Sequence, residues 1–397
     1  HLSPRSAVCI IPPPDHWNVS GVINNQKQFS GGNSTMLFKC GHNPNHDASH
    51  SPSDASGGHS VKVEKLGVRT VDIHCHLHVP EADALVKGVF DLKNEPLLWF
   101  ANDATRKFQM AHGQEIMPRA TDTSLRIAEM DASGVDVQAI STAPNHYCYW
   151  AEPDLGREVA QTVNNKLAAT VAEHPDRFVA LGTVPLQDPQ MAVAELERCV
   201  TELGMKGVEI NADVAGQELS KAGLDPFFAK CEELGALIFI HPSGYAKGDR
   251  FADHYFSNII GNPLATTVAV HYLIFDGVMD RHPGLKVVLA HGGGFLGSYP
   301  ARIDHAHPLR TDMQRELPAG KVPTDYLKRF FFDSVVFSNE QLEFITKYYG
   351  ADHVLMGTDY PYDMAETDPV GHVMGSDLTD DQKRAILGEN AARLLNL

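Results

Sequence analysis

The amino-acid sequence predicts an α/β protein whose main domain is a (β/α)8 TIM barrel. Two observations lead to this fold class. From residue 66 onward, short β-branched apolar runs alternate with longer amphipathic stretches, which is the pattern of parallel strands joined by helices. Eight such runs can be counted, and histidines or an aspartate closely follow four of them. Eight parallel strands with functional side chains at their carboxyl ends are typical of this barrel.

The predicted strands are short and rich in Val, Ile, Leu and Phe. They cover residues 68–73, 135–140, 178–184, 207–210, 236–240, 285–290, 330–336 and 353–356. The stretches between them place apolar residues at helical spacing. The predicted helices cover residues 122–133, 156–174, 190–203, 225–234, 263–281, 339–349 and 379–395. The segment 79–119 is too long for a simple loop, so we expect it to insert a lid or small helices over the barrel mouth.

Residues 1–65 differ in composition from the rest of the chain. They are rich in Ser, Gly, Asn, Pro and His and show little periodic apolar pattern. Such a segment buries too little apolar surface to fold by itself. We therefore expect residues 1–65 to form a flexible N-terminal extension and residues 66–397 to form the barrel.

The charge and cysteine content narrow the classes of partner and compartment. With 33 basic and 50 acidic side chains the net charge is −17, which repels nucleic acid and anionic lipid surfaces. No run approaches eighteen apolar residues and no charged-then-apolar leader opens the chain, so no membrane span or secretion is expected. Six cysteines without a C-x-x-C pair suggest a reduced, cytoplasmic setting.

Three histidines at alternate positions, His74, His76 and His78, follow the first apolar run just where its strand should end. In an extended segment, side chains two residues apart point to the same face. His74 and His76 can therefore converge on one metal ion while Cys75 turns away. By the same geometry His78 also faces inward.

Three further strands end in side chains that bind metals. His241 follows the fifth run, His291 follows the sixth, and Asp359 follows the eighth. Neutral imidazoles combined with one carboxylate suit zinc or a similar divalent ion that keeps an open position. His291 could be a fifth ligand in a two-metal site, but no lysine at the end of the fourth strand would bridge two ions. A single-ion site with His291 as a base is the favoured interpretation.

Other polar or aromatic residues near strand ends are ambiguous. Asp333 could orient a ligand or could simply be a hydrogen-bonded rim residue. Glu209 and Asn211 could contact substrate, and ordinary rim packing explains them equally well. The aromatic residues after the second strand, Tyr149 and Trp150, could form a pocket wall or part of the core, as could the nearby His146.

These motifs together resemble the amidohydrolase superfamily, and within it the decarboxylase branch typified by aminocarboxymuconate semialdehyde decarboxylase. The resemblance rests on segments 72–76, 241–242, 291–294 and 357–361, and extends to 126–131, 149–153, 184–187, 332–334 and 388–391. It covers roughly residues 68–397 and leaves residues 1–65 without a counterpart. It implies the metal-dependent hydrolase type of TIM barrel.

The resemblance also implies roles for individual residues. One Zn²⁺ per chain, or Mn²⁺ or another divalent ion in its place, would be held by the set His74, His76, His241 and Asp359. His291 would activate water or relay protons, and either it or Asp359 would be the acid that protonates the substrate carbon.

Four further residues are expected to contact the substrate. Arg302 would bind the carboxylate of the substrate, and in a homodimer it would do so across the subunit interface. Gln114 occupies the place of a second substrate-binding arginine of the family, although Arg119 lies close in sequence. Trp150 is expected to line the pocket, and His78 is expected to lie beside it. Because an amide lacks the charge and fork of a guanidinium, Gln114 leaves the substrate open.

The favoured function is a metal-dependent, non-oxidative decarboxylase of a small unsaturated or aromatic carboxylic acid in aromatic catabolism. Aminocarboxymuconate semialdehyde and hydroxybenzoates are examples of such acids. Protonation of the substrate before loss of CO2, and addition of hydroxide before it, are both compatible with the sequence. The alternative function is a metal-dependent hydrolase or hydratase acting on a lactone or unsaturated diacid. A nonenzymatic metal-binding protein is a third interpretation, which the complete ligand set disfavours.

Overall fold

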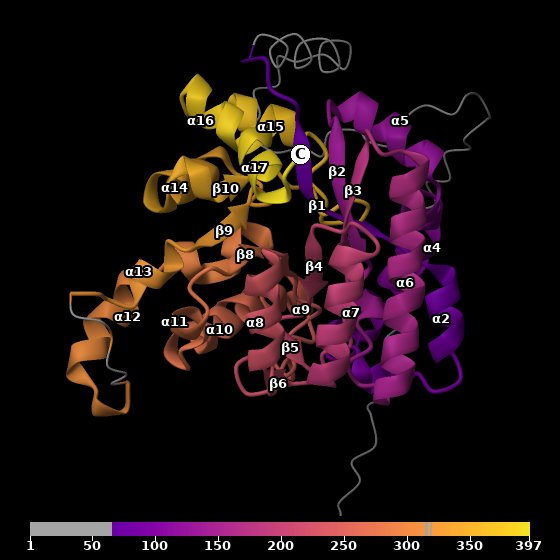
Figure 1. The fold of residues 1–397 in the computed structure, drawn as a ribbon, viewed down its shortest axis with the longest axis horizontal. Coiled ribbons are helices and arrows are strands. Elements are labelled where there is room, and N and C mark those ends of the chain that lie inside the picture. The colour runs from indigo at the N-terminus through magenta and orange to yellow at the C-terminus, as the bar shows by residue number, and fades with distance from the viewer. Residues whose placement is uncertain (1–65, 314–316, 318–319) are drawn as a thin grey trace, which may run out of the picture. The chain divides into compact units, whose positions relative to one another are not determined.

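A computed structural model describes residues 66–397 apart from 314–316 and 318–319. The predicted N-terminal extension lies outside the described residues. The described chain contains a sheet of eight strands, each parallel to its paired neighbours (Figure 1). Its strands, in order, are β1 (Val71–Leu77), β2 (Val137–Thr142), β3 (Phe178–Gly182), β4 (Gly207–Ile210), β7 (Leu237–Ile240), β8 (Lys286–Leu289), β9 (Phe330–Asp333) and β10 (Val354–Leu355). The predicted TIM barrel is confirmed. A separate short hairpin pairs β5 (Asp213–Val214) with β6 (Gln217–Glu218).

Backbone hydrogen bonds bring the last strand back to the first. The N–H of Ile73 donates to the carbonyl of Met356 at 2.9 Å, and the N–H of His76 donates to the carbonyl of Tyr360 at 2.8 Å. Cys75 and Tyr360 form an isolated parallel bridge between the same segments. This closure places the segment after β10 beside β1.

The first strand extends further than its apolar run predicts. Its pairing with β2 continues through His76 opposite Ser141 and Leu77 opposite Thr142. His74 and His76 therefore lie within the strand rather than in a loop after it. Both side chains are polar and buried. The backbone pairing with β2 keeps both residues within the strand.

Helices follow the strands along the chain. They include α5 (Thr123–Ser133), α6 (Pro153–Glu173), α7 (Pro189–Thr201), α8 (Asp225–Leu234), α10 (Gly261–Phe275), α14 (Asn339–Tyr349) and α15 (Pro369–Gly375). The predicted helix 263–281 is interrupted, because Gly277 adopts a left-handed φ of 81° and a separate short helix, α11 (Val278–Arg281), begins after it. The predicted C-terminal helix is divided into α16 (Asp380–Arg384), a π-helical turn and α17 (Asn390–Leu395).

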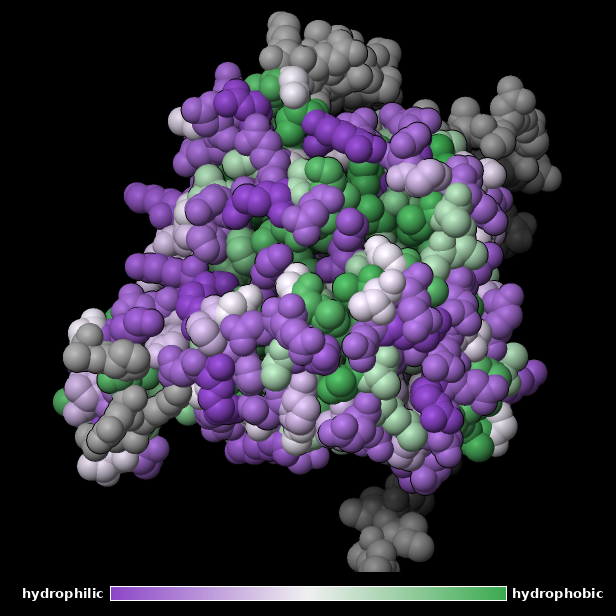
Figure 2. All heavy atoms as spheres, viewed as in Figure 1, coloured by the Kyte–Doolittle hydropathy of each residue, from purple (hydrophilic) through white to green (hydrophobic). Residues whose placement is uncertain are grey.

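Buried apolar side chains form two groups because both faces of the sheet are covered. Alternate strand residues such as Val137, Val179 and Phe239 belong to the group inside the barrel. The intervening residues, such as Ile140 and Ile238, pack with apolar side chains of the surrounding helices. The face seen in Figure 2 is mainly hydrophilic around its edge, whereas apolar side chains gather toward its middle. None of the helices in the described chain is long and apolar enough to cross a membrane.

The segment between β1 and β2 contains several helices. Ahead of α5, they are α2 (Pro80–Val86), a 3-10 turn at Leu92–Asn94, α3 (Pro96–Trp99) and α4 (Asp103–Thr121). This segment packs on the loop that follows β7. Gly244 in that loop has a φ of 77°, and a Cβ there would lie 2.4 Å from the backbone nitrogen of Leu97, so only glycine permits this approach. The amide of Gln109 donates to the hydroxyl of Tyr255 at 2.8 Å and adds a polar contact.

A buried arginine on α5 connects that helix to the barrel wall. Arg126 is 1% exposed, and its guanidinium donates to the carbonyl of His76 and, at 3.1 Å, to the side chain of Gln138. It also lies over the ring of Tyr360 at 4.6 Å. One side chain thus supports both β1 and the segment after β10.

We predict that Arg126→Met lowers the free energy of unfolding by about 2–3 kcal/mol, because it removes charge-assisted hydrogen bonds from buried acceptors. Chemical denaturation measures the loss. The matched control is Arg157→Met, which removes a half-exposed arginine paired with Asp154 and is expected to change stability by less than about 0.5 kcal/mol. Equal stability of the two variants would contradict the supporting role of Arg126.

Candidate metal centre

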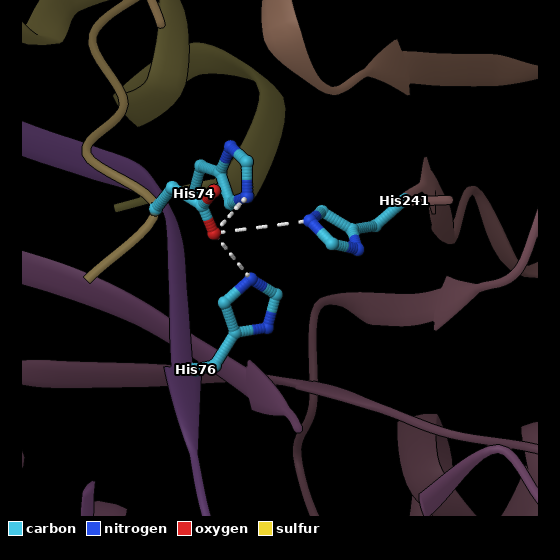
Figure 3. A group of neighbouring side chains, drawn as sticks. His74, His76 and His241 are labelled. Atoms are coloured by element: carbon cyan, nitrogen blue, oxygen red, sulfur yellow. Dashed lines mark ion pairs between the residues drawn. The ribbon is translucent and has the colours of Figure 1, made fainter. Parts of the chain in front are cut away.

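Four predicted ligands converge at the barrel mouth. One ligand atom from each of His74, His76, His241 and Asp359 lies within 4.8 Å of the others, and all four residues are buried. Asp359 Oδ1 lies 3.2 Å from the Nε2 atoms of both His74 and His76, and 3.8 Å from that of His241. Figure 3 shows the three imidazoles pointing toward this one carboxylate oxygen. Three strands of the barrel therefore supply the centre.

The two histidines of β1 are oriented through their Nδ1 atoms. His74 Nδ1 lies 2.5 Å from Asp333 Oδ2, and His76 Nδ1 donates to the carbonyl of Thr142 at 2.8 Å. A proton fixed on Nδ1 leaves the lone pair on Nε2, and both Nε2 atoms are buried without a hydrogen-bond partner in the described chain. Such hydrogen bonds are the usual way in which proteins orient metal-binding imidazoles.

His241 and Asp359 complete the group with complementary charge states. Burial holds the pKa of His241 well below its usual range, and the neighbouring imidazoles of His76 and His74 act in the same direction. His241 is therefore a neutral imidazole, which is the form that binds metals. Burial alone would raise the pKa of Asp359, but the surrounding imidazoles, led by His74, hold it well below its usual range. Asp359 is therefore a carboxylate.

Asp333, at the end of β9, joins the centre to the loop after β8. Besides contacting His74, its carboxylate accepts hydrogen bonds from the backbone N–H groups of His291 at 2.9 Å, Gly292 at 2.7 Å and Val335 at 3.1 Å. It is fully buried. The sequence left its role open between an orienting group and a rim residue, and these contacts show that it orients His74 and fixes the backbone at His291.

His291 lies beside the four converging residues rather than among them. Its Nε2 is 3.4 Å from Asp359 Oδ2, whereas Asp359 Oδ1 faces the other three imidazoles. His291 has a left-handed φ of 56°, and Asp359 has one of 63°. Non-glycine residues in this conformation are uncommon and concentrate at functional sites. The two oxygens of Asp359 thus have different neighbours.

The donor set fits a divalent cation. The Nε2 atoms of His74, His76 and His241 and the Oδ1 atom of Asp359 are buried, and none has a hydrogen-bond partner in the described chain. Leaving buried polar atoms unpaired is unfavourable, so such a group indicates a missing partner. A cation bound by three imidazole nitrogens and one carboxylate oxygen would satisfy all four atoms at once.

The four residues predicted to contact the substrate do not lie together in the structure. Trp150 is partly buried and lines a cavity together with Tyr147, Tyr149, Asn211 and Ser243. His78 contacts Asp83 instead of the four-residue group.

Gln114, on α4, is exposed, as is Arg302, on α12 (Pro300–Ala306). Arg119 pairs with Glu129 at 3.0 Å. Gln114 and Arg302 are therefore not buried with the converging side chains.

Two further carboxylates support the centre. Asp72 accepts hydrogen bonds from the backbone of His74 at 3.0 Å and from the hydroxyl of Thr358 at 2.7 Å, so it ties β1 to the loop that carries Asp359. Burial raises its pKa to about 6. Its place before the His-x-His pattern was the only sequence signal for it. Glu209 is fully buried, accepts from Ser141 and Tyr147 at 2.6 Å, and lies 3.5 Å from His76 Nδ1.

Comparisons with known proteins agree with this site. A family model described as amidohydrolase matches residues 71–397. A 2-amino-3-carboxymuconate-6-semialdehyde decarboxylase of Dictyostelium discoideum is 37% identical over 286 residues, which cover 72% of this chain and 79% of the relative. The crystal structure of 5-carboxyvanillate decarboxylase from Sphingomonas paucimobilis gives a TM-score of 0.74 at 28% identity, with 83% of this chain and 99% of that chain covered.

A second solved structure carries a metal and a ligand. It is a 5-carboxyvanillate decarboxylase from Novosphingobium aromaticivorans complexed with manganese and 4-hydroxy-3-methoxy-5-nitrobenzoic acid. It gives a TM-score of 0.73 at 26% identity, with 84% of this chain and 97% of that chain covered.

We predict that Asp333→Asn weakens divalent-metal affinity about 10–100-fold, because the amide loses the charge that orients His74. Competition with a chelator measures the change. Asp225→Asn is the matched control, since Asp225 pairs with His282 at 3.1 Å on the outer helix α8. Unchanged affinity in Asp333→Asn would show that this carboxylate does not support metal binding.

Proposed function

Because the chain belongs to the amidohydrolase family, in its branch of metal-dependent non-oxidative decarboxylases, we propose that it removes CO2 from a small unsaturated or aromatic acid. The observation that carries the proposal is the buried convergence of three imidazole Nε2 atoms and one carboxylate oxygen. The decarboxylases similar to it act, by their names, on a carboxymuconate semialdehyde and on carboxyvanillate. Both classes of acid are candidate substrates.

The proposed cofactor is one Zn²⁺ per chain, held by His74, His76, His241 and Asp359. Three imidazole nitrogens with one carboxylate oxygen suit zinc, and manganese is the alternative because a similar decarboxylase is complexed with it. When bound, such an ion supplies Lewis acidity to the substrate's carboxylate and an adjacent oxygen.

The protein's own contribution is a proton donor for the carbon that loses CO2. In the reaction the carbon–carboxylate bond breaks, CO2 leaves, and a proton takes its place on the carbon. His291 Nε2 and Asp359 Oδ2 are 3.4 Å apart, close enough to exchange a proton after small adjustments. The His291 side chain is 15% exposed and that of Asp359 is 6% exposed. We assign His291 as the group that takes protons from solvent and Asp359 Oδ2 as its partner next to the reacting carbon.

Arg302 is proposed to bind the substrate carboxylate of a neighbouring subunit. It is exposed on α12 and does not join the buried group of its own chain. A guanidinium is well suited to a carboxylate because it offers two parallel N–H donors. The proposed form of the protein is a homodimer in the cytoplasm. Arg302 would have this role if α12 of one subunit reaches the barrel mouth of its partner. Gln114 would then add only a neutral contact.

We predict that the purified protein releases CO2 from at least one acid in a panel of hydroxybenzoates and carboxymuconate semialdehydes. His291→Ala should lower kcat about 10²–10⁴-fold because general acid–base catalysis is lost. Metal content, measured by elemental analysis, should be unchanged. The control is His353→Ala, whose histidine pairs with Asp352 away from the site. Retained turnover in His291→Ala would remove its role, and lactone opening without CO2 release would support a hydrolase.

We further predict complementation between two inactive variants. His291→Ala and Arg302→Ala chains should each be nearly inactive, but a heterodimer isolated after co-expression should recover activity. One of its two sites would combine an intact His291 with the partner's intact arginine. Two tags on the chains allow the heterodimer to be purified and assayed. An inactive heterodimer would place Arg302 in its own subunit's site, and an active Arg302→Ala chain would place it outside both sites.

A further inference from the structure

We propose a second divalent-cation site, formed by His78, Asp83 and His146. One ligand atom from each of these residues lies within 4.8 Å of the others, and no residue is shared with the four-ligand centre. The proposal does not depend on the proposed function. It gives a role to the third histidine of the His-x-His-x-His run, which the decarboxylase centre does not use.

The fold brings the three residues together from separate segments. His78 directly follows β1, Asp83 lies in α2, and His146 ends the 3-10 turn Pro144–His146 after β2. Because β1 and β2 are parallel neighbours, their carboxyl ends lie on the same rim of the barrel. Helix α2 begins at Pro80, shortly after His78, and places the carboxylate of Asp83 between the two imidazoles.

The geometry of this second group is that of two imidazoles facing one carboxylate. Asp83 Oδ2 lies 2.7 Å from His78 Nε2, and Asp83 Oδ1 lies 2.9 Å from His146 Nε2. The two rings are 4.7 Å apart between centroids. The four-ligand centre has a related arrangement, with two Nε2 atoms each 3.2 Å from Asp359 Oδ1. Small outward shifts would admit a cation between the three donors.

Burial and exposure suit a site that is open on one side. His146 is 1% exposed, and its Nδ1 has no hydrogen-bond partner within the described chain. The side chains of His78 and Asp83 are 13% and 46% exposed. An ion can therefore enter from solvent and complete its coordination with water, as ions with three protein ligands do.

The donor types define the class of ion. Two imidazole nitrogens with one carboxylate oxygen favour Zn²⁺, Co²⁺, Ni²⁺ or Cu²⁺ over Mg²⁺ and Ca²⁺, which prefer oxygen ligands. With three protein ligands and partial exposure, we infer weaker binding than at the buried centre of four ligands. An ion there would fasten α2 to the rim of the barrel. The alternative is that the same three side chains form only a hydrogen-bonded link.

The test is a Co²⁺ titration of the full-length protein after removal of bound metal, followed by visible absorption and elemental analysis. We expect two equivalents, the second bound at least tenfold more weakly. In Asp83→Asn and in His146→Gln the second equivalent should be lost or weakened at least tenfold. In His241→Ala the tighter equivalent should be lost and the weaker one kept, so failure of the two sites can be told apart.

The matched control is Asp91→Asn, because Asp91 is an exposed aspartate that caps a 3-10 turn and asparagine can replace it there. It should retain both equivalents. Circular dichroism verifies that each variant is folded. Saturation of the unmodified protein at one equivalent would overturn the proposal. So would a second equivalent that survives in both Asp83→Asn and His146→Gln, since it would belong to other histidines of the chain.

Discussion

The arrangement of the candidate metal centre depends on the buried carboxylate of Asp333. Its carboxylate receives the ring of His74 from β1 and backbone N–H groups from the loop after β8 and from its own loop. A single buried anion therefore sets both the tautomer of a metal-binding imidazole and the left-handed backbone of His291. Burial of this negative charge is tolerated because the groups that contact its oxygens are hydrogen-bond donors.

The larger features were predictable because their signals are local. Apolar runs identified all eight strands, and the barrel rule then placed His241 and Asp359 on the same rim as His74. The roles of Asp72 and Asp333 were not predictable, because they depend on hydrogen bonds between segments far apart in the chain. The contact between His78 and Asp83 was also not predictable from simple alternation. Strand β1 ends at Leu77, so His78 lies in the connection to α2, where it contacts Asp83.

The two oxygens of Asp359 separate two tasks within one side chain. Oδ1 faces the three imidazoles and Oδ2 faces His291. Its left-handed backbone and the hydrogen bond from its N–H to the carbonyl of His74 hold it in this orientation. In the proposed reaction, the same carboxylate would therefore bind the cation through Oδ1 and exchange a proton with His291 through Oδ2.

The closure of the barrel between β10 and β1 has a consequence for how the protein matures. His74 and His76 are synthesised well before Asp359, which follows the last strand of the barrel. The hydrogen bonds of Ile73 and His76 to residues after β10 form only once that last part is present. A nascent chain can offer an ion at most an incomplete set of ligands. The complete set of four ligands therefore exists only after the last strand of the barrel has joined the first.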